Sequence, residues 1–194
     1  MQSRIPRQSG QDLDAHRVDD DAGLSAELAS VLAAARRRAV RDRDPQIDTA
    51  HLLHSLLEYD PEARAALEGG PQLARLLGYL VQRSIGYGLR WQGGVEDSAA
   101  LPVAPGAEGY SPVAAAAMAY ACGRAKGRGD VRACGLDLLA GIVVDPAARA
   151  VEVLDRAGVD VAELRTRIDG PGLPGPLLFE DSPRHYVRDG EAGL

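Results

Sequence analysis

Two histidines and two cysteines have the types and spacings that could support metal or nucleophilic chemistry. His51 and His54 are three residues apart, so on a helix they would lie near one face and could begin a zinc site. The spacing offers no obvious third ligand, so we interpret both as structural or surface histidines and keep metal binding as the alternative. Cys122 and Cys134 form no C-x-x-C motif, which favours free thiols over a redox or metal pair.

The sequence offers little else for catalysis. A nucleophilic cysteine needs a histidine and an acid brought close to it, and no spacing in the chain indicates that arrangement. The phosphate-binding pattern G-x-x-x-x-G-K-[ST] is absent, and the nearest stretch, Gly123 to Gly127, lacks both the spacing and the hydroxyl. We therefore expect no enzyme, no catalytic residue, no cofactor and no bound metal.

The charge distribution argues against nucleic-acid binding. The formal net charge is −6, yet residues 24–83 and residues 110–169 each carry 8 basic and 8 acidic side chains. Each of these two segments is therefore neutral, and the excess acidic residues lie outside them. Neither segment has the cluster of basic side chains that nucleic-acid binding requires. Arginines cluster between Arg36 and Arg43, but Asp42 interrupts them, so a solvated helix face is the simpler interpretation and an acidic partner the alternative.

No apolar stretch approaches the roughly 18 residues of a membrane span, and the first twenty residues do not resemble a signal peptide. We therefore expect a soluble, cytoplasmic protein without membrane association. Aromatic residues make up only 4% of the chain and alanine is abundant, a composition that favours closely packed helices over strands.

Apolar residues recur at helical spacing in two blocks. In the first, we expect helices starting after Ser25, after Asp48 or Thr49, after Asp60-Pro61 and at Pro71. In the second, we expect them after Tyr110-Ser111-Pro112, after the break at 131–135, after Asp145-Pro146 and after Asp160. The predicted boundaries are a disordered lead-in at 1–22, a first unit at 23–83, a linker at 84–109 containing Trp91, a second unit at 110–169 and a disordered tail at 170–194.

The two blocks match each other at a constant separation. Leu24 aligns with Tyr110, Asp44 with Asp130, and Leu52-Leu53 with Leu138-Leu139, each 86 residues apart. After one deletion, Asp60-Pro61 aligns with Asp145-Pro146, and each is followed by Ala-Arg-Ala. We therefore predict an all-α fold in which one four-helix unit is written twice and forms a pseudo-symmetric bundle of about eight helices.

The doubled unit resembles the Clp N-terminal repeat, the module at the front of ClpA- and ClpC-type unfoldases. The stretch from Asp48 to Leu53 is similar to the family's Gly-Thr-Glu-His-Leu-Leu, and its counterpart runs from Cys134 to Leu139. The ending from Val153 to Asp160 resembles the family's Val-Leu-x-x-Leu-Gly-Val-Asp. The resemblance covers Leu24 to about Asp169 and implies a stand-alone, bacterial, chaperone-related domain without the ATPase modules.

The resemblance also implies a binding surface between the two units. Leu24 and Tyr110 open them, and Ala50, His51, Leu136 and Asp137 belong to the motif of the second helix of each unit, so these six residues form our candidate partner-binding seam. The family's glutamate is associated with phosphoarginine binding, because a carboxylate can bond a guanidinium. Ala50 and Leu136 replace it here, which argues against that ligand.

We therefore expect a non-catalytic module that binds a protein or peptide. The partner would be a component of the Clp machinery or a cyclic peptide, with the protein acting as an accessory or a decoy. A regulatory or scaffolding protein that kept the fold without any Clp connection is the alternative.

Overall fold

The computed structural model describes residues 23–67, 71–84, 96 and 109–170, and within these residues the fold is all-α. The described helices are α2 (Ala26–Asp42), α3 (Thr49–Tyr59), α4 (Pro61–Leu67), α5 (Pro71–Ser84), α6 (Pro112–Arg128), α7 (Gly135–Ile142), α8 (Arg149–Ala157) and α9 (Val161–Asp169). The predicted disordered lead-in, most of the linker with Trp91, and all of the tail beyond residue 170 lie outside the described residues. None of the described helices has the length and apolarity needed to cross a bilayer.

Most helix starts confirm the predicted caps. The hydroxyls of Ser25 and Ser111 accept hydrogen bonds from the backbone N–H groups three residues later, at 3.1 Å in both cases. Asp48 caps α3 and Asp160 caps α9 through their carboxylates. These side chains satisfy N–H groups that have no partner inside the first helical turn, which is why short polar residues mark the starts.

The start of α8 corrects one prediction. Asp145-Pro146 does not open this helix, which begins at Arg149 after Ala148, a residue whose side chain cannot cap. The Asp145 carboxylate instead accepts a bond from Ala147 N (2.8 Å) within a turn. The first N–H groups of α8 find their acceptors in Thr49 and Glu96, which come from distant parts of the chain.

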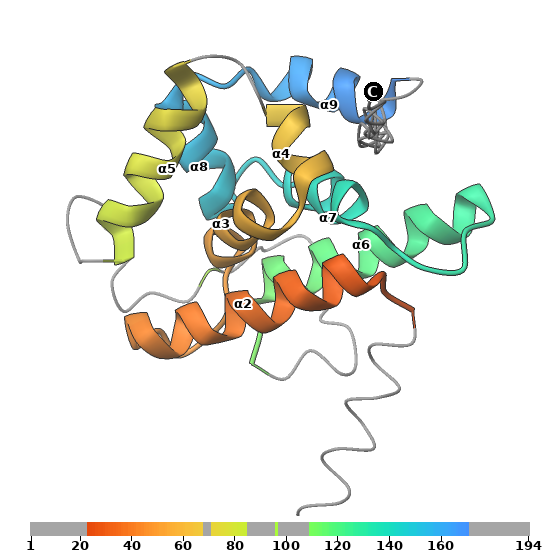
Figure 1. The fold of residues 1–194 in the computed structure, drawn as a ribbon, viewed down its shortest axis with the longest axis horizontal. Coiled ribbons are helices and arrows are strands. Elements are labelled where there is room, and N and C mark those ends of the chain that lie inside the picture. The colour runs from red at the N-terminus through yellow and green to blue at the C-terminus, as the bar shows by residue number, and fades with distance from the viewer. Residues whose placement is uncertain (1–22, 68–70, 85–95, 97–108, 171–194) are drawn as a thin grey trace, which may run out of the picture.

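One apolar core joins the elements. In Figure 1, α2 and α6 run along one side of the molecule, α3 and α7 lie in the centre, and α5 and α8 lie together at another side. The largest packing interfaces are α6 with α7, α2 with α3, and α5 with α8. A single cluster of buried Leu, Ile, Val and Ala side chains extends through both halves of the described chain. The cross-half contact of α5 with α8 shows that this core is shared.

Two short backbone pairings tie the halves together. The segment before α2 pairs in parallel with the segment before α7, through Ser25 N to Ala133 O (2.8 Å) and Ala133 N to Gly23 O (2.9 Å). The segment before α6 pairs in parallel with the segment before α3, between Tyr110 and Ile47.

In this second pairing, Ser111 N donates to Ile47 O (2.9 Å) and Ile47 N donates to Gly109 O (2.7 Å). Each residue of the second pairing lies 86 positions from its counterpart in the first. The two contacts are therefore reciprocal, because each half supplies one segment of each kind.

Candidate functional site

A buried carboxylate lies where three helix starts converge. Glu96 is 5% exposed and accepts hydrogen bonds from Thr49 N at the start of α3 (2.9 Å), from the Ser111 hydroxyl at the start of α6 (2.6 Å) and from Arg149 N at the start of α8 (2.7 Å). The Thr49 hydroxyl also donates to Glu96 and accepts from Ala150 N (3.0 Å). Each of the three helix starts therefore supplies at least one hydrogen-bond donor to the Glu96 carboxylate.

This arrangement is favourable because unpaired N–H groups and the helix dipoles make helix N-termini attractive to anions. Glu96 thus acts as an internal anion that pins α3, α6 and α8 together. Sequence reasoning missed it, because Glu96 lies in the predicted linker and no local spacing links it to the helix starts.

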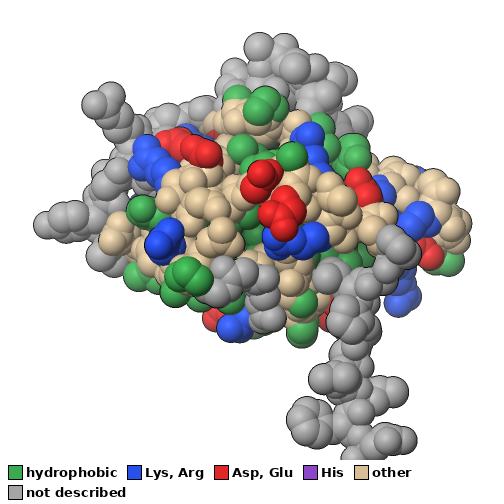
Figure 2. All heavy atoms as spheres, turned by 90° about the horizontal axis from the view of Figure 1, so that it is seen from above, with side chains coloured by type: hydrophobic (Ala, Val, Ile, Leu, Met, Phe, Trp, Pro, Cys, Tyr) green, Lys and Arg blue, Asp and Glu red, His purple; other side chains and the backbone are tan. Residues whose placement is uncertain are grey.

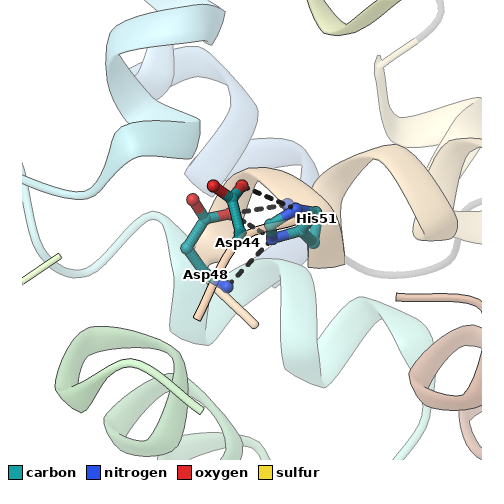
Figure 3. Close-up of side chains that lie close together, drawn as sticks. All are labelled: Asp44, Asp48 and His51. Carbon is teal, nitrogen blue, oxygen red and sulfur yellow. Dashed lines mark hydrogen bonds and ion pairs between the residues drawn. The ribbon is translucent and has the colours of Figure 1, made fainter. Parts of the chain in front are cut away.

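A second polar cluster surrounds His51. The imidazole is 1% exposed, its Nδ1 lies 2.8 Å from Asp48 Oδ1, and its Nε2 lies 3.2 Å from Asp44 Oδ2 and 3.8 Å from Asp42 Oδ2. Figure 3 shows the Asp44, Asp48 and His51 side chains directed toward one another. Asp48 and His51 also form a capping box at the start of α3, which fixes the ring against the backbone. The cluster thus combines imidazole nitrogen with carboxylate oxygen, the donor types of a metal site.

His54, the residue paired with His51 in the sequence-based zinc hypothesis, lies elsewhere. Its Nδ1 lies 3.3 Å from Arg38 Nη1, and Arg38 also forms an ion pair with Glu58. Among the described residues, the cluster of possible metal ligands around His51 does not include His54, so the histidine pair does not define a site. The possible ligands beside His51 are aspartates, and the signal that could have identified them is Asp-x-Asp at the end of one helix with histidine in the first turn of the next.

Asp137, 86 residues after His51, is an acidic residue in the matching place. This buried carboxylate accepts from Arg128 Nη1 (2.5 Å) and Nη2 (2.8 Å), from Arg124 Nε (3.1 Å) and from Cys134 N (3.0 Å). Burial alone would raise the pKa of Asp137, but the hydrogen bonds from Arg128 and Cys134 outweigh it and hold the pKa below its usual value. Asp137 is therefore an ionised anchor between α6 and α7.

The cysteines are placed as free thiols, both partly buried. Cys134 precedes α7, and its Sγ lies 3.3 Å from Asp137 Oδ2. Burial raises the pKa of the Cys134 thiol, and the neighbouring carboxylate adds to the increase. A thiol with a raised pKa is a poor nucleophile at neutral pH, since the thiolate is the reactive form.

The six residues of the predicted seam do not all reach the surface. Ala50, His51 and Asp137 are at most 1% exposed, and Leu24 is 6% exposed. Tyr110 and Leu136 are half-buried and pack against the core. A partner that binds at this seam would therefore touch Tyr110 and Leu136, while the other four support them from behind.

A surface hollow of about 410 Å³ lies in the second half, between α6, α7 and α9. It is lined by Tyr120, Arg124, Ala140, Val144, Arg165, Ile168 and Asp169. Tyr120 and Val144 are 45% and 40% exposed, so they offer apolar surface to a partner. No sequence signal predicts the hollow, because its lining comes from three helices that only the fold brings together.

The face in Figure 2 carries no single-sign charge patch. Acidic and basic side chains are interleaved across it, and hydrophobic side chains form small separate groups. Within the predicted arginine cluster, Arg36 and Arg37 are exposed on α2, whereas the Arg38 side chain is only 13% exposed and lies against Glu58. The cluster is therefore partly used for internal contacts.

No protein-family model matches the chain, and no curated protein matches it either.

Proposed function

We propose that this protein is a non-catalytic binding module of the Clp N-domain type, which receives a protein or peptide segment. The observation that carries the proposal is the reciprocal backbone pairing, in which Leu24 pairs with Ala133 and Ile47 with Tyr110. Two copies of one helical unit, each lending its entry segment to the other, would produce this pattern. The doubled unit is the feature on which the resemblance to the Clp repeat rests.

The described surface supports binding more readily than catalysis. The hollow between α6, α7 and α9 offers Tyr120 and Val144 as apolar contacts with Arg124 and Asp169 at its edge, a mixture that suits a peptide with both apolar and polar side chains. The one cysteine beside a carboxylate, Cys134, has a raised pKa. These observations favour a partner protein over a substrate.

Affinity capture with the full chain tests the proposal. We expect the tagged protein to enrich Clp subunits or Clp substrates from a bacterial lysate, and Tyr120→Arg or Leu136→Arg to abolish that enrichment by placing charge on the half-exposed surface. Val40→Arg is the matched control, because Val40 is 74% exposed on α2 and does not line the hollow. Equal capture by all variants, or no Clp protein in any of them, would refute the Clp connection.

A scaffolding role without Clp partners is the second candidate, and Glu96 favours it. Glu96 bonds the donors at the starts of α3, α6 and α8, so these donors are satisfied within the chain and are not available to a partner. Ala50 and Leu136 add no carboxylate for a guanidinium. Titration with phosphoarginine and with a Clp-targeting cyclic peptide separates the two roles: saturable binding of either supports the Clp module, and binding of neither supports the scaffold.

A further inference from the structure

We propose that Asp42, Asp44 and His51 form a binding site for one divalent transition-metal ion, with Zn²⁺ the best-matched ion and Asp48 orienting the histidine. The site lies at the junction of α2 and α3. It is independent of the partner-binding function proposed above, and neither depends on the other.

The distances suit ligands of a single ion. His51 Nε2 lies 3.2 Å from Asp44 Oδ2 and 3.8 Å from Asp42 Oδ2. Nitrogen and oxygen ligands lie about 2.0–2.2 Å from zinc, so two ligands at a tetrahedral angle are roughly 3.3–3.6 Å apart. Each of the two carboxylate oxygens therefore already lies at nearly the distance from His51 Nε2 that a shared ion would require.

The histidine nitrogen itself indicates a cation. His51 Nε2 is completely buried and has no hydrogen-bond partner, although two carboxylates lie within 4 Å of it. A buried nitrogen without a partner is costly, and in the tautomer with the proton on Nδ1 the Nε2 lone pair is repelled by the carboxylate oxygens that it faces. A metal ion between the three atoms would remove both penalties.

The other ring nitrogen of His51, Nδ1, lies beside a carboxylate, as it does in many metal-binding histidines. Nδ1 lies 2.8 Å from Asp48 Oδ1, and Asp48 Oδ2 in turn accepts from Arg149 Nη1 (2.8 Å). In the tautomer that carries the proton on Nδ1, this carboxylate accepts the N–H and leaves the Nε2 lone pair for the metal. The other tautomer would use the contact of Asp48 N with Nδ1 (3.1 Å), and metal binding would select against it.

The backbone fixes both carboxylates relative to the ring. α2 ends at Asp42, and Arg43 adopts a left-handed conformation (φ 59°) that reverses the chain before Asp44. Asp48 Oδ1 also accepts a hydrogen bond from His51 N (2.9 Å), which holds the histidine at the start of α3 in either tautomer. Asp42 is the last residue of α2 and His51 lies in the first turn of α3, while Asp44 lies in the short connection between them, where its backbone N–H donates to Ala39 O (3.0 Å).

In the second half of the chain, an arginine side chain lies at the position that corresponds to Asp42. The residues 86 positions after Asp42 and His51 are Arg128 and Asp137, and they form a direct ion pair (2.5 Å). Arginine there supplies the positive charge in the protein itself. We therefore expect one metal ion per chain, bound in the first half alone.

The ligand set selects the class of ion. Imidazole with carboxylates suits Zn²⁺ and similar transition metals, whereas Mg²⁺ and Ca²⁺ prefer sites made only of oxygen. Mg²⁺ and Ca²⁺ should therefore bind far more weakly than Zn²⁺.

Calorimetric titration of the EDTA-treated full chain with Zn²⁺ at neutral pH tests the proposal. We expect one ion per chain, a rise in Tm on zinc addition, and binding at least about tenfold weaker in Asp44→Asn, as loss of a ligand predicts. His54→Gln is the matched control, because His54 lies beside Arg38, and should bind zinc like the wild type. Far-UV circular dichroism shows whether each variant is folded, and Asp44 is the ligand best suited to substitution because its side chain is 23% exposed.

A second measurement keeps the test decisive if Asp44→Asn is unstable. The ¹⁵N resonances of the His51 ring in the wild-type protein should move to values typical of metal-bound Nε2 and protonated Nδ1 when zinc is added. The proposal is overturned if zinc fails to bind at millimolar concentration, or if Asp44→Asn binds it as tightly as the wild type. It is also overturned if both ring nitrogens remain protonated at neutral pH in the presence of zinc.

Discussion

Asp137 and His51 occupy the same position in the first turns of α7 and α3, and each bonds to the backbone N–H that precedes its helix. One is an anion held by arginines, and the other is an imidazole surrounded by aspartates. The two junctions thus place different chemical groups at the same position, a carboxylate beside arginines in one and an imidazole beside aspartates in the other. The replacement of His51 by Asp137 is visible in the sequence only after the halves are aligned. Its consequence follows from the distances to the neighbouring arginines and aspartates.

The low pKa of Asp137 predicts how stability depends on pH at this junction. Arg128 and Cys134 stabilise the ionised form in the folded protein, while in the unfolded chain the pKa is about 3.9. The contribution is therefore fully present above about pH 4 and is lost as the pH falls through the lower folded pKa. We expect Asp137→Asn to lower the free energy of unfolding by about 1–3 kcal/mol at pH 7 and by much less at the lowest pH at which both proteins still fold.

Urea denaturation of both proteins from the acid limit of folding to pH 7 measures this difference. Asp130→Asn is the control, because Asp130 also bonds to Arg128 (3.0 Å) but its side chain is 53% exposed. An exposed ion pair of this kind should contribute less than about 1 kcal/mol. An Asp137→Asn effect that stays constant with pH would contradict an ionised role for the buried carboxylate.

At the scale of the helices, local capping residues were sufficient to predict most starts. Ser25, Asp48, Ser111 and Asp160 all cap the helices that their spacing indicates. The prediction for the start of α8 was wrong because the acceptors of its first N–H groups, Glu96 and Thr49, come from other parts of the chain. Local sequence patterns report bonds over three or four residues, and they cannot report bonds between residues about fifty or a hundred positions apart.

Replacing Glu96 tests whether this long-range capping of α3 and α8 stabilises the fold. In Glu96→Ala, Thr49 N and Arg149 N lose their acceptor in a buried setting, and we expect a loss of about 1–3 kcal/mol in the free energy of unfolding. Hydrogen exchange should accelerate most at Arg149 N. Glu152→Ala serves as the control, since the Glu152 side chain is 40% exposed on the same helix. An unchanged urea midpoint for Glu96→Ala would mean that Glu96 does not join the helix starts.

The packing of α6 against α7, the most extensive helix pair among the described residues, depends on a glycine. A Cβ built on Gly141 would lie 2.4 Å from the backbone oxygen of Ala117, so Gly141→Ala must push the helices apart. We expect a loss of about 1–3 kcal/mol, measured by thermal and urea denaturation. Gly123→Ala, on the exposed face of α6 with no atom within 4 Å of its Cβ, should instead stabilise by up to about 1 kcal/mol. Equal effects at the two positions would contradict the close approach.

For the whole molecule, the sequence predicted the helical class but could not predict which surfaces remain open. The six seam residues were chosen from a family resemblance, and the core buries four of them. The hollow beside Tyr120 and the junction around His51 both form where separate helices meet. Their side chains are ordinary in the sequence, and only tertiary packing gives them a shared environment.

The shared core and the reciprocal pairings predict that neither half folds alone. Ser25 and Ala133 exchange backbone bonds across the halves, and Gln72 Nε2 donates to Gly158 O (2.8 Å) while Arg167 Nη1 donates to Ala66 O (3.0 Å). A chain divided after Gly94 would leave each fragment with half of the apolar core exposed. We therefore expect each fragment alone to have low helicity by far-UV circular dichroism and no cooperative urea transition.

Mixing the two fragments should restore the helicity, because the contacts that join the halves need no covalent connection. The intact chain should unfold in one transition, with the same midpoint by near-UV and far-UV circular dichroism, as expected for one cooperative unit. Native-like helicity and a cooperative transition in either isolated fragment would contradict this expectation. That outcome would mean that each four-helix unit is an independent domain and that the pairing of Leu24 with Ala133 adds only a contact between finished units.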